Sequence, residues 1–417
     1  MPVNVASLLA VLLVVASVPA QAQQTSTATI SGEAAGLQVE VLSGQIGERP
    51  AGSANYDQAV LYASEQLLSW GYQPTLQSFP ILDYDDRGSS VEIVSGGAGS
   101  VAADTLTYSA GGLVEVPLVA VGGVGTPEDV AAVDVRGKIA LVQRGTLRFA
   151  EKVANAAAAG AVGVIVYNTE GPARVRGSLA RTSTIPAVVI SGDDGQRLLN
   201  LMSAGSVTLR LTVDASTGER PSTNVVAELP GGEPGAGVVV FGGHLDSVPG
   251  SPGANDNASG SAVVLELARM LARVDPSQRP HTLRFMLFGA EELGLFGSRY
   301  YVDTLPEADR RSIRAMINLD MVGVGEAWRF GGTESLVDVA MGASADLGQQ
   351  AIPMRGPLSG ASDHANFINA GIPALFIHRV DDPNYHTGGD RPGLIDPNAL
   401  SAAGTIALRV LESLATQ

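Results

Sequence analysis

A histidine and two acids lie close together in the stretch Phe241–Gly260, FGGHLDSVPGSPGANDNASG. They are His244, Asp246 and Asp256. The chain has no cysteine, so any zinc must be bound by imidazole nitrogens and carboxylate oxygens. The glycines of the stretch let the backbone turn tightly around an ion. The stretch predicts a metal site, although a hydrogen-bonded structural histidine at a strand end is the simpler alternative.

Three later segments add residues of the same kinds. They are Glu291 and Glu292 in GAEELG, Asp320 in NLDM, and His386 in the loop YHT. Two histidines and three carboxylates suit zinc, and a carboxylate that bridges would suit two ions. Consecutive side chains point in different directions, so one glutamate can bind metal while the other faces a substrate. Taken alone, an acidic pair is more typical of a solvated surface.

The predicted secondary structure places most of these residues at strand ends. Val238–Phe241 is an apolar run typical of a buried strand, and Ser261–Val274 has apolar residues at helical spacing. Further strands are expected at Thr282–Phe288 and Ala315–Leu319, each followed by a candidate acid. In open α/β sheets, ligands bind in the crevice at the carboxyl ends of the strands. We therefore expect the candidate residues to meet at one edge of a sheet.

The same alternation extends over the rest of the chain. A helix is expected at Tyr56–Trp70 and a strand at Pro74–Phe79, and the chain closes with a helix near Ser335–Leu347, a strand at Ala374–Ile377 and a helix at Asn398–Leu414. This spacing predicts an α/β fold with a mixed, mostly parallel central sheet flanked by helices.

The segment Leu113–Leu211 has a different pattern of apolar runs. Short apolar strands surround one alanine-rich helix, Phe149–Ala159, and are expected at Val116–Val121, Lys138–Val142, Val162–Tyr167 and Ile185–Ile190. The runs GKIALVQRGTLRFAEKVANAAAAGAVGVIVYN and IPAVVISGDDGQRLL resemble the protease-associated domain, which implies a small inserted α/β unit of an exported peptidase. The segment contains no histidine and no catalytic constellation. A passive spacer and a part in shaping substrate access both remain open.

The N-terminus resembles an export signal. The apolar run Ala6–Ala20 precedes Ala20-Gln21-Ala22, which has the A-x-A form of a cleavage site. We expect a signal peptide cleaved after Ala22 and a secreted or periplasmic protein. Met1–Val5 contains no Lys or Arg, so an uncleaved anchor is the alternative.

These patterns divide the chain into four parts. We expect a signal peptide at 1–22, a flexible lead-in at 23–34, a catalytic domain formed by 35–110 and 220–417, and an insert domain at 111–215. The 417 residues carry a formal net charge of −16. Such an acidic balance argues against nucleic acids and anionic membranes as partners.

In order along the chain, GGHLDS, GANDNASG, GAEELG, NLDM and YHT resemble the co-catalytic di-zinc aminopeptidases of the aminopeptidase S and aminopeptidase Y group. The resemblance covers nearly the whole mature chain, including the insert. It implies the zinc exopeptidase fold, two Zn²⁺ ions per chain, and removal of N-terminal residues from peptides and proteins by a water activated between the two ions. Because every apolar run after the N-terminal one is interrupted by charge or glycine, we expect no stable membrane anchor.

The resemblance also assigns roles by position. It implies that His244 and Asp320 bind the first zinc and that Glu292 and His386 bind the second. Asp256 corresponds to the acid that bridges both ions. The family's general base corresponds to Glu291, and the acid that orients the first histidine corresponds to Asp246. In the family, the peptide bond after the bridging acid is typically cis, which here is Asp256–Asn257.

Two positions near these ligands are less specific. Tyr385 precedes His386 and is a candidate hydrogen-bond donor to the oxyanion, or else a packing tyrosine. The three other histidines, His281, His364 and His378, are expected to be structural or solvated.

Three rival functions share parts of this pattern. Carboxypeptidases and dipeptidases on the same sheet use the same ligands but need a cationic clamp for the substrate carboxylate, for which Arg299, Arg355, Arg379 and Arg391 are candidates. A single-zinc glutaminyl cyclase fits less well, because the insert does not suit it. A non-enzymatic binding module would be expected to lack ligands, and all five are present. Cobalt or manganese instead of zinc, the preferred N-terminal residue and the oligomeric state remain open.

Overall fold

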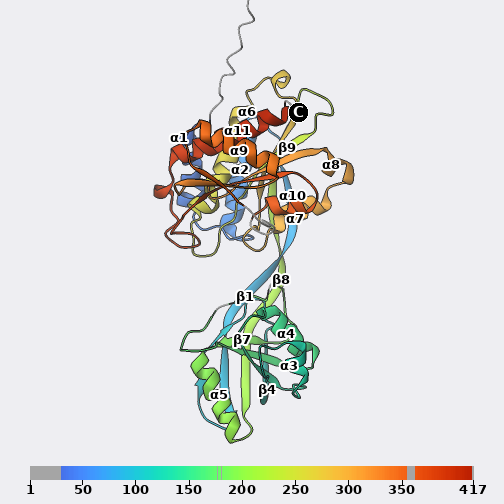
Figure 1. Ribbon diagram of the computed structural model, residues 1–417, viewed down its shortest axis with the longest axis vertical. Coiled ribbons are helices and arrows are strands. Elements are labelled where there is room, and N and C mark those ends of the chain that lie inside the picture. Colours follow the sequence, from blue (N-terminus) through green and yellow to red (C-terminus); the bar gives the residue numbers. More distant parts are fainter. Residues whose placement is uncertain (1–29, 176, 180, 355–361, 416–417) are drawn as a thin grey trace, which may run out of the picture.

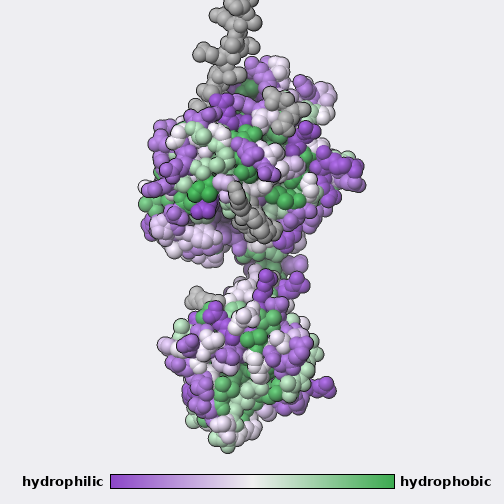
Figure 2. Space-filling model, viewed as in Figure 1, coloured by the Kyte–Doolittle hydropathy of each residue, from purple (hydrophilic) through white to green (hydrophobic). Residues whose placement is uncertain are grey.

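The computed structural model describes residues 30–175, 177–179, 181–354 and 362–415, so the predicted signal peptide lies outside the described residues. The molecule consists of two lobes joined by a ribbon of two long strands (Figure 1), and its surface narrows to a waist at that ribbon (Figure 2). Helix α1 (Gly32–Val39) begins inside the predicted lead-in, with the Ser31 side chain accepting from Ala34 N. In the described part of the chain, no helix is both long and apolar enough to cross a membrane.

The larger lobe is built on a mixed sheet. In the described part of the chain its strands follow the order β13 (Ala351–Pro353), β12 (Ala327–Gly332), β14 (Ala374–Val380), β11 (Ile313–Leu319), β9 (Val238–His244), β10 (Thr282–Phe288) and β8 (Thr208–Leu229), and the sheet continues from β8 into the smaller lobe. The four central strands β14, β11, β9 and β10 are parallel, whereas β12 and β8 run antiparallel to their central neighbours. This confirms the predicted mixed, mostly parallel sheet.

Helices cover both faces of this sheet. The alternation of side chains along β9 sends Val239 and Phe241 into one core and Val238 and Val240 into another. The first core is covered by α1, α2 (Ala54–Ser69), α6 (Gly260–Leu271), α9 (Glu334–Asp346) and α11 (Pro397–Ala415). The second is covered by α7 (Phe296–Thr304) and α10 (His364–Asn369), near α8 (Glu307–Ser312). Short helical turns complete the lobe: η1 (Glu40–Ile46), η2 (Ala254–Ser259), η3 (Pro276–Gln278) and η4 (Pro392–Leu394).

The smaller lobe, here called the insert lobe, comprises residues 96–207 and the adjoining parts of β1 and β8. It contains the predicted helix as α4 (Phe149–Ala158), together with α3 (Pro127–Ala131) and α5 (Gly192–Ala204). From β8 its strands run β4 (Gly112–Ala120), β5 (Ile139–Gln143), β6 (Gly163–Tyr167), β7 (Ala187–Ile190) and β3 (Ala103–Thr105), and β2 (Ser100–Val101) pairs with β1. Two apolar clusters of its own, separate from those of the larger lobe, form its core.

The two lobes are connected by β1 (Thr75–Ser95) and β8, which pair antiparallel from Thr75↔Val226 to Ser95↔Thr208. β8 also pairs with β10 in the larger lobe and with β4 in the insert lobe. The sequence pattern indicated only a short strand at Pro74–Phe79, because residues 82–90 of β1 are intermediate or exposed and pair with β8, and the strand enters a core again only at Val91 and Ile93. Since both strands run through both lobes, the domain limits at 110/111 and 215/220 stay predictions.

Candidate metal centre

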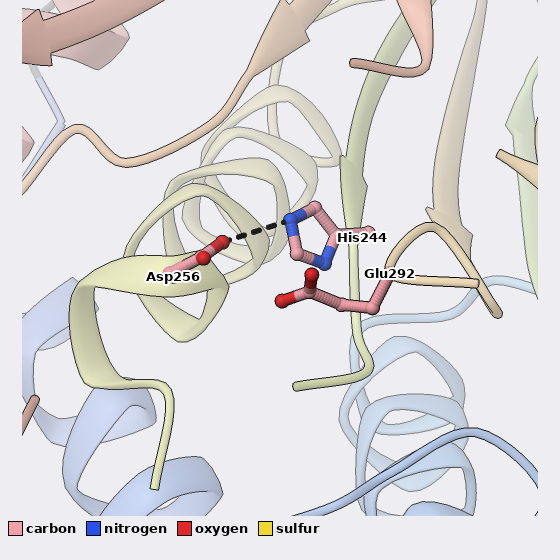
Figure 3. Close-up of side chains that lie close together, drawn as sticks. All are labelled: His244, Asp256 and Glu292. Carbon is pink, nitrogen blue, oxygen red and sulfur yellow. Dashed lines mark ion pairs between the residues drawn. The ribbon is translucent and has the colours of Figure 1, made fainter. Parts of the chain in front are cut away.

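The predicted ligands converge at the carboxyl edge of the larger sheet. His244 is the last residue of β9, Asp320 follows β11, and Glu292 lies in the turn that follows β10. Asp256 lies in η2, which leads into α6, and His386 lies in the loop after β14. His244, Asp256 and Glu292 point toward one another (Figure 3). This edge of the sheet is where the order of an open α/β fold places a ligand.

The five side chains form two groups that share Asp256. In the first group, His244 Nε2 lies 3.2 Å from Asp256 Oδ1 and 3.3 Å from Asp320 Oδ1. In the second group, His386 Nε2 lies 3.1 Å from Asp256 Oδ2 and 3.1 Å from Glu292 Oε2. Because the two oxygens of Asp256 face different histidines, this carboxylate has the geometry of a bridge. The Asp256–Asn257 peptide bond is cis, as the resemblance implied.

Burial leaves some of these donor atoms without partners. His244 is 1 % exposed and Asp320 is 6 % exposed. Among the described residues, Glu292 Oε1 and Asp320 Oδ1 are buried and have no hydrogen-bond partner. A buried polar atom without a partner costs roughly 1–3 kcal/mol. Oxygen and imidazole donors around a shared carboxylate fit zinc, so bound cations would satisfy atoms that the protein leaves unpaired.

The acids of the site repel one another in the absence of cations. Burial, together with the charge of Asp256, raises the pKa of Glu292 to about 8. Burial likewise raises the pKa of Glu291 well above its usual range, and the charge of Asp320 adds to the effect. Burial lowers the pKa of His244, but the carboxylates of Glu291 and Asp320 outweigh it and raise that pKa well above 6.5. Without bound cations, Glu291, Glu292 and His244 therefore bind protons more readily than the same groups do in water.

Asp246 holds the acidic pair in place. It is fully buried, and its Oδ1 and Oδ2 accept hydrogen bonds from Glu291 N at 3.1 Å and Glu292 N at 3.3 Å. The resemblance assigned this acid to orienting the first histidine. His244 Nδ1 lies 3.0 Å from the backbone oxygen of Asp246 and 3.7 Å from its Oδ1. With either contact, Nε2 of His244 faces the carboxylates of Asp256 and Asp320.

A cavity of about 380 Å³ opens over the two groups. Glu291 lines it, with Oε2 4.0 Å from His244 Nε2. Ala290, which precedes it, has φ +56°, a left-handed turn that redirects the chain directly after β10. Tyr385 also lines the cavity, 51 % exposed, and its ring stacks on that of His386 with centroids 3.8 Å apart. Burial and the nearby acid Asp256 raise the pKa of Tyr385, so its hydroxyl keeps its proton.

Sequence reasoning missed three buried residues that contact the segments carrying the ligands. Arg49 is fully buried and donates to backbone carbonyls between His244 and Asp256. Asp390 accepts from the backbone of Asn255 and Asp256. Asn255 Oδ1 accepts from two backbone N–H groups in the segment after Asp320. The only local signal was the position of Asn255 in GANDNASG and of Asp390 four residues after His386.

The other histidines lie outside the two groups. His281 Nδ1 lies 2.9 Å from Ala236 O, and His378 Nδ1 lies 3.0 Å from Asp320 O. His364 is fully buried and its ring stacks on Phe376 with centroids 4.6 Å apart. His378 also lines the cavity, and both ring nitrogens of His364 are buried without a partner among the described residues, so the structural or solvated role expected for these histidines stays a prediction.

Three of the arginines considered for a carboxylate clamp donate to backbone carbonyls, and one of them, Arg379, also lines the cavity, with its Nε buried and without a partner among the described residues. Arg379 donates to Gly325 O and lies over the ring of Trp328. Arg299 donates to Gly294 O and Arg391 donates to Gly388 O. Arg355 lies outside the described residues.

Comparisons with known proteins identify the families that the two lobes resemble. Residues 224–411 match the model of "Peptidase family M28", and residues 114–198 match that of the "PA domain". Aminopeptidase YwaD of Bacillus subtilis is 34% identical over 88% of this chain and 81% of its own length. The structure of an aminopeptidase from Aneurinibacillus sp. strain AM-1 superposes with a TM-score of 0.80 and 33% identity, over 93% of this chain and 94% of the other. BSAP, a zinc aminopeptidase from Bacillus subtilis, gives a TM-score of 0.70 and 30% identity, over 92% and 95%.

Proposed function

Because this chain belongs to peptidase family M28, we propose that it is a zinc aminopeptidase that uses two zinc ions, with Glu291 as the general base. The observation that carries the proposal is the pair of donor groups that share Asp256, each with its own histidine. Under this proposal the first ion is bound by His244, Asp256 and Asp320. The second is bound by Asp256, Glu292 and His386.

Zinc bound at these residues would lower the pKa of a water molecule toward roughly 7 and polarise the scissile carbonyl. Glu291 is the residue placed to move the proton. Its backbone is fixed by Asp246, and its side chain lines the cavity with Oε2 4.0 Å from His244 Nε2, farther from that nitrogen than the oxygens of Asp256 and Asp320. Burial raises its pKa, which suits a base that takes a proton from the attacking water and passes it to the departing amine.

Tyr385 supplies the proposed second contact to the reacting carbonyl. Its ring is held against His386, and its raised pKa keeps the hydroxyl a donor near neutral pH. A donor fixed at the mouth of the cavity can stabilise negative charge as it develops on the carbonyl oxygen.

The charge of the cavity favours an aminopeptidase over a carboxypeptidase. The described lining residues include six acids: Asp256, Glu291, Glu292, Asp320, Asp381 and Asp382. Two zinc ions would offset the charge of the three ligands among them, so the remaining negative charge comes from Glu291, Asp381 and Asp382. The single arginine among the described lining residues, Arg379, donates to Gly325 O and lies over Trp328. Such a surface attracts the ammonium group of a peptide N-terminus and repels a C-terminal carboxylate. The expected substrates are therefore peptides or proteins with a free N-terminus.

The test combines metal analysis with a substrate panel. Zinc-loaded protein should contain two zinc ions per chain and should hydrolyse aminoacyl-anilides with a free amine. It should not hydrolyse their N-acetylated counterparts or substrates with a free C-terminus and a blocked N-terminus. A single zinc per chain after metal loading, or release of C-terminal residues, would contradict the proposal.

We also propose that the protein is exported. The support is the apolar run Ala6–Ala20 with the A-x-A site that follows it. Mass spectrometry of the protein recovered from its native source should show an N-terminus at Gln23 in the extracellular or periplasmic fraction. A cytosolic protein that begins at Met1 would contradict this.

A further inference from the structure

The segment between His244 and Asp256 is held by one buried arginine. Arg49 Nε donates to Leu245 O at 2.7 Å, Nη1 to Pro252 O at 2.5 Å, and Nη2 to Gly253 O at 2.8 Å. The backbone of Arg49 also bonds to Ser247 in both directions. The planar guanidinium thus fixes both ends of the segment that connects a ligand of the first group to the bridging acid.

The bridging acid is held from another direction by Asp390. Its Oδ1 accepts from Asn255 N at 2.7 Å, and its Oδ2 accepts from Asp256 N at 3.0 Å. Its backbone oxygen accepts from Ala254 N at 3.4 Å. Because Asp390 follows His386 by four residues, these bonds attach the loop of one ligand to the backbone of another.

Both residues are fully buried, and neither can be replaced without leaving polar groups unpaired. Burial lowers the pKa of Arg49 to about 10, so the group stays charged at neutral pH beside Asp246 and Asp390. A lysine would keep that charge but lose the fork of donors. An asparagine at position 390 would turn an NH₂ group toward one of the two N–H donors.

We propose that Arg49 and Asp390 are positioning residues that hold Asp256 between the two donor groups. Arg49 sets the distance from Asp256 to the group of His244 and Asp320. Asp390 sets the distance from Asp256 to the group of His386 and Glu292. This inference rests on the proposed two-zinc function and deepens it.

The first experiment measures the zinc affinity of Asp390→Asn by competition with a chelator. Residues that orient metal ligands are worth roughly 10–100-fold in metal affinity, so one of the two ions should bind that much more weakly. The matched control is Asp129→Asn in the insert lobe. Asp129 Oδ2 also accepts backbone N–H groups, from Val124, Gly125 and Thr126, far from the metal centre. The control should lose stability and keep both zinc affinities.

The second experiment separates the two residues in a His386→Ala background, where a single ion should remain in the first group. Adding Arg49→Lys should weaken that remaining ion by roughly 10–100-fold. Adding Asp390→Asn should weaken that ion by a smaller factor than Arg49→Lys does, because Asp390 still bonds to the backbone of Asp256 but the loop that it attaches has already lost its histidine. A role confined to general stability would affect the remaining ion equally in both cases.

The outcomes distinguish this inference from the proposed function. A wild-type protein that binds fewer than two zinc ions contradicts the proposed function itself. A wild-type protein with two ions, together with Asp390→Asn and Arg49→Lys variants whose zinc affinities stay within about threefold, overturns the positioning roles alone. Should Asp390→Asn not fold, Asp390→Glu, which keeps both oxygens but displaces them by one methylene, takes its place with the same expected loss.

Discussion

The two lobes are built from similar helices and strands, but they differ in whether their buried side-chain polar atoms have hydrogen-bond partners. In the described residues of the insert lobe between 96 and 207, every buried side-chain polar atom has a partner. Its buried cation, Lys152, donates to Val124 O and Gln143 O. In the larger lobe, Glu292 Oε1, Asp320 Oδ1 and both ring nitrogens of His364 have no partner among the described residues. Because native proteins pair nearly all such atoms, the unpaired acids mark the place where a ligand completes the structure.

The largest expected effect is a loss of turnover in a variant of the larger lobe that lacks the general base but keeps the metal ligands. Glu291→Gln cannot accept the proton of water, so the turnover number should fall by roughly 10²–10⁴-fold, or about 3–5.5 kcal/mol. Zinc content and melting temperature should stay close to those of the wild type. Kinetics on an aminoacyl-anilide with parallel metal analysis checks this, and an activity within about threefold of wild type with both ions bound would remove the base from the mechanism.

Glu292→Gln is the matched comparison at the neighbouring position. It removes a charged ligand, so the second zinc should be lost while the first remains. If both glutamate variants keep two ions, the unpaired Glu292 Oε1 is not a ligand atom.

Removal of zinc should affect one lobe and not the other. At free zinc about a thousandfold above the dissociation constant, one bound ion adds roughly 4 kcal/mol to stability. Chelation should therefore accelerate hydrogen exchange in the peptides around His244, Glu292 and Asp320. The insert peptides Ile139–Gln143 and Gly163–Tyr167 should exchange at unchanged rates. Equal acceleration in both lobes would mean that the contrast in polar burial does not reflect metal binding.

His364 allows a pH test of an unpaired group that is not a proposed ligand. Burial lowers its pKa to about 4, against 6.5 in the unfolded chain. Between these values the unfolded state binds the proton and the native state does not, so stability is full above about pH 6.5 and falls as the pH drops toward 4. The shift corresponds to about 3 kcal/mol. Urea unfolding of the metal-free proteins should show this extra loss in the wild type and not in His364→Leu.

The smallest effect should come from Lys152 in the insert lobe. Lys152→Met removes both hydrogen bonds to Val124 O and Gln143 O. Leaving these carbonyls unpaired should cost roughly 1–3 kcal/mol of stability in that lobe. The specificity constant for a small anilide should stay within about twofold, and a large loss of activity would show that the insert takes part in small-substrate turnover.

The sequence predicted the parts of the molecule that depend on local pattern. The strands expected at Thr282–Phe288 and Ala374–Ile377 are apolar runs that correspond to β10 and β14, and Asp320 directly follows the strand expected at Ala315–Leu319. The strands β12 and β13 were not predicted, because each is short and gives no clear alternation. Arg49 was not predicted either, since its role depends on carbonyls 196 to 204 residues further along the chain. No window of local sequence contains such a contact.

The ribbon of β1 and β8 determines how the insert lobe is attached to the larger lobe. The chain leaves the larger lobe and returns to it at positions that face each other directly, such as Leu82 and Glu219. For the larger lobe, everything between these two residues takes the place of a hairpin turn. The loop closure that a long insertion would otherwise require is provided by the ladder of backbone hydrogen bonds. The larger lobe thus carries a whole domain on a two-stranded connection.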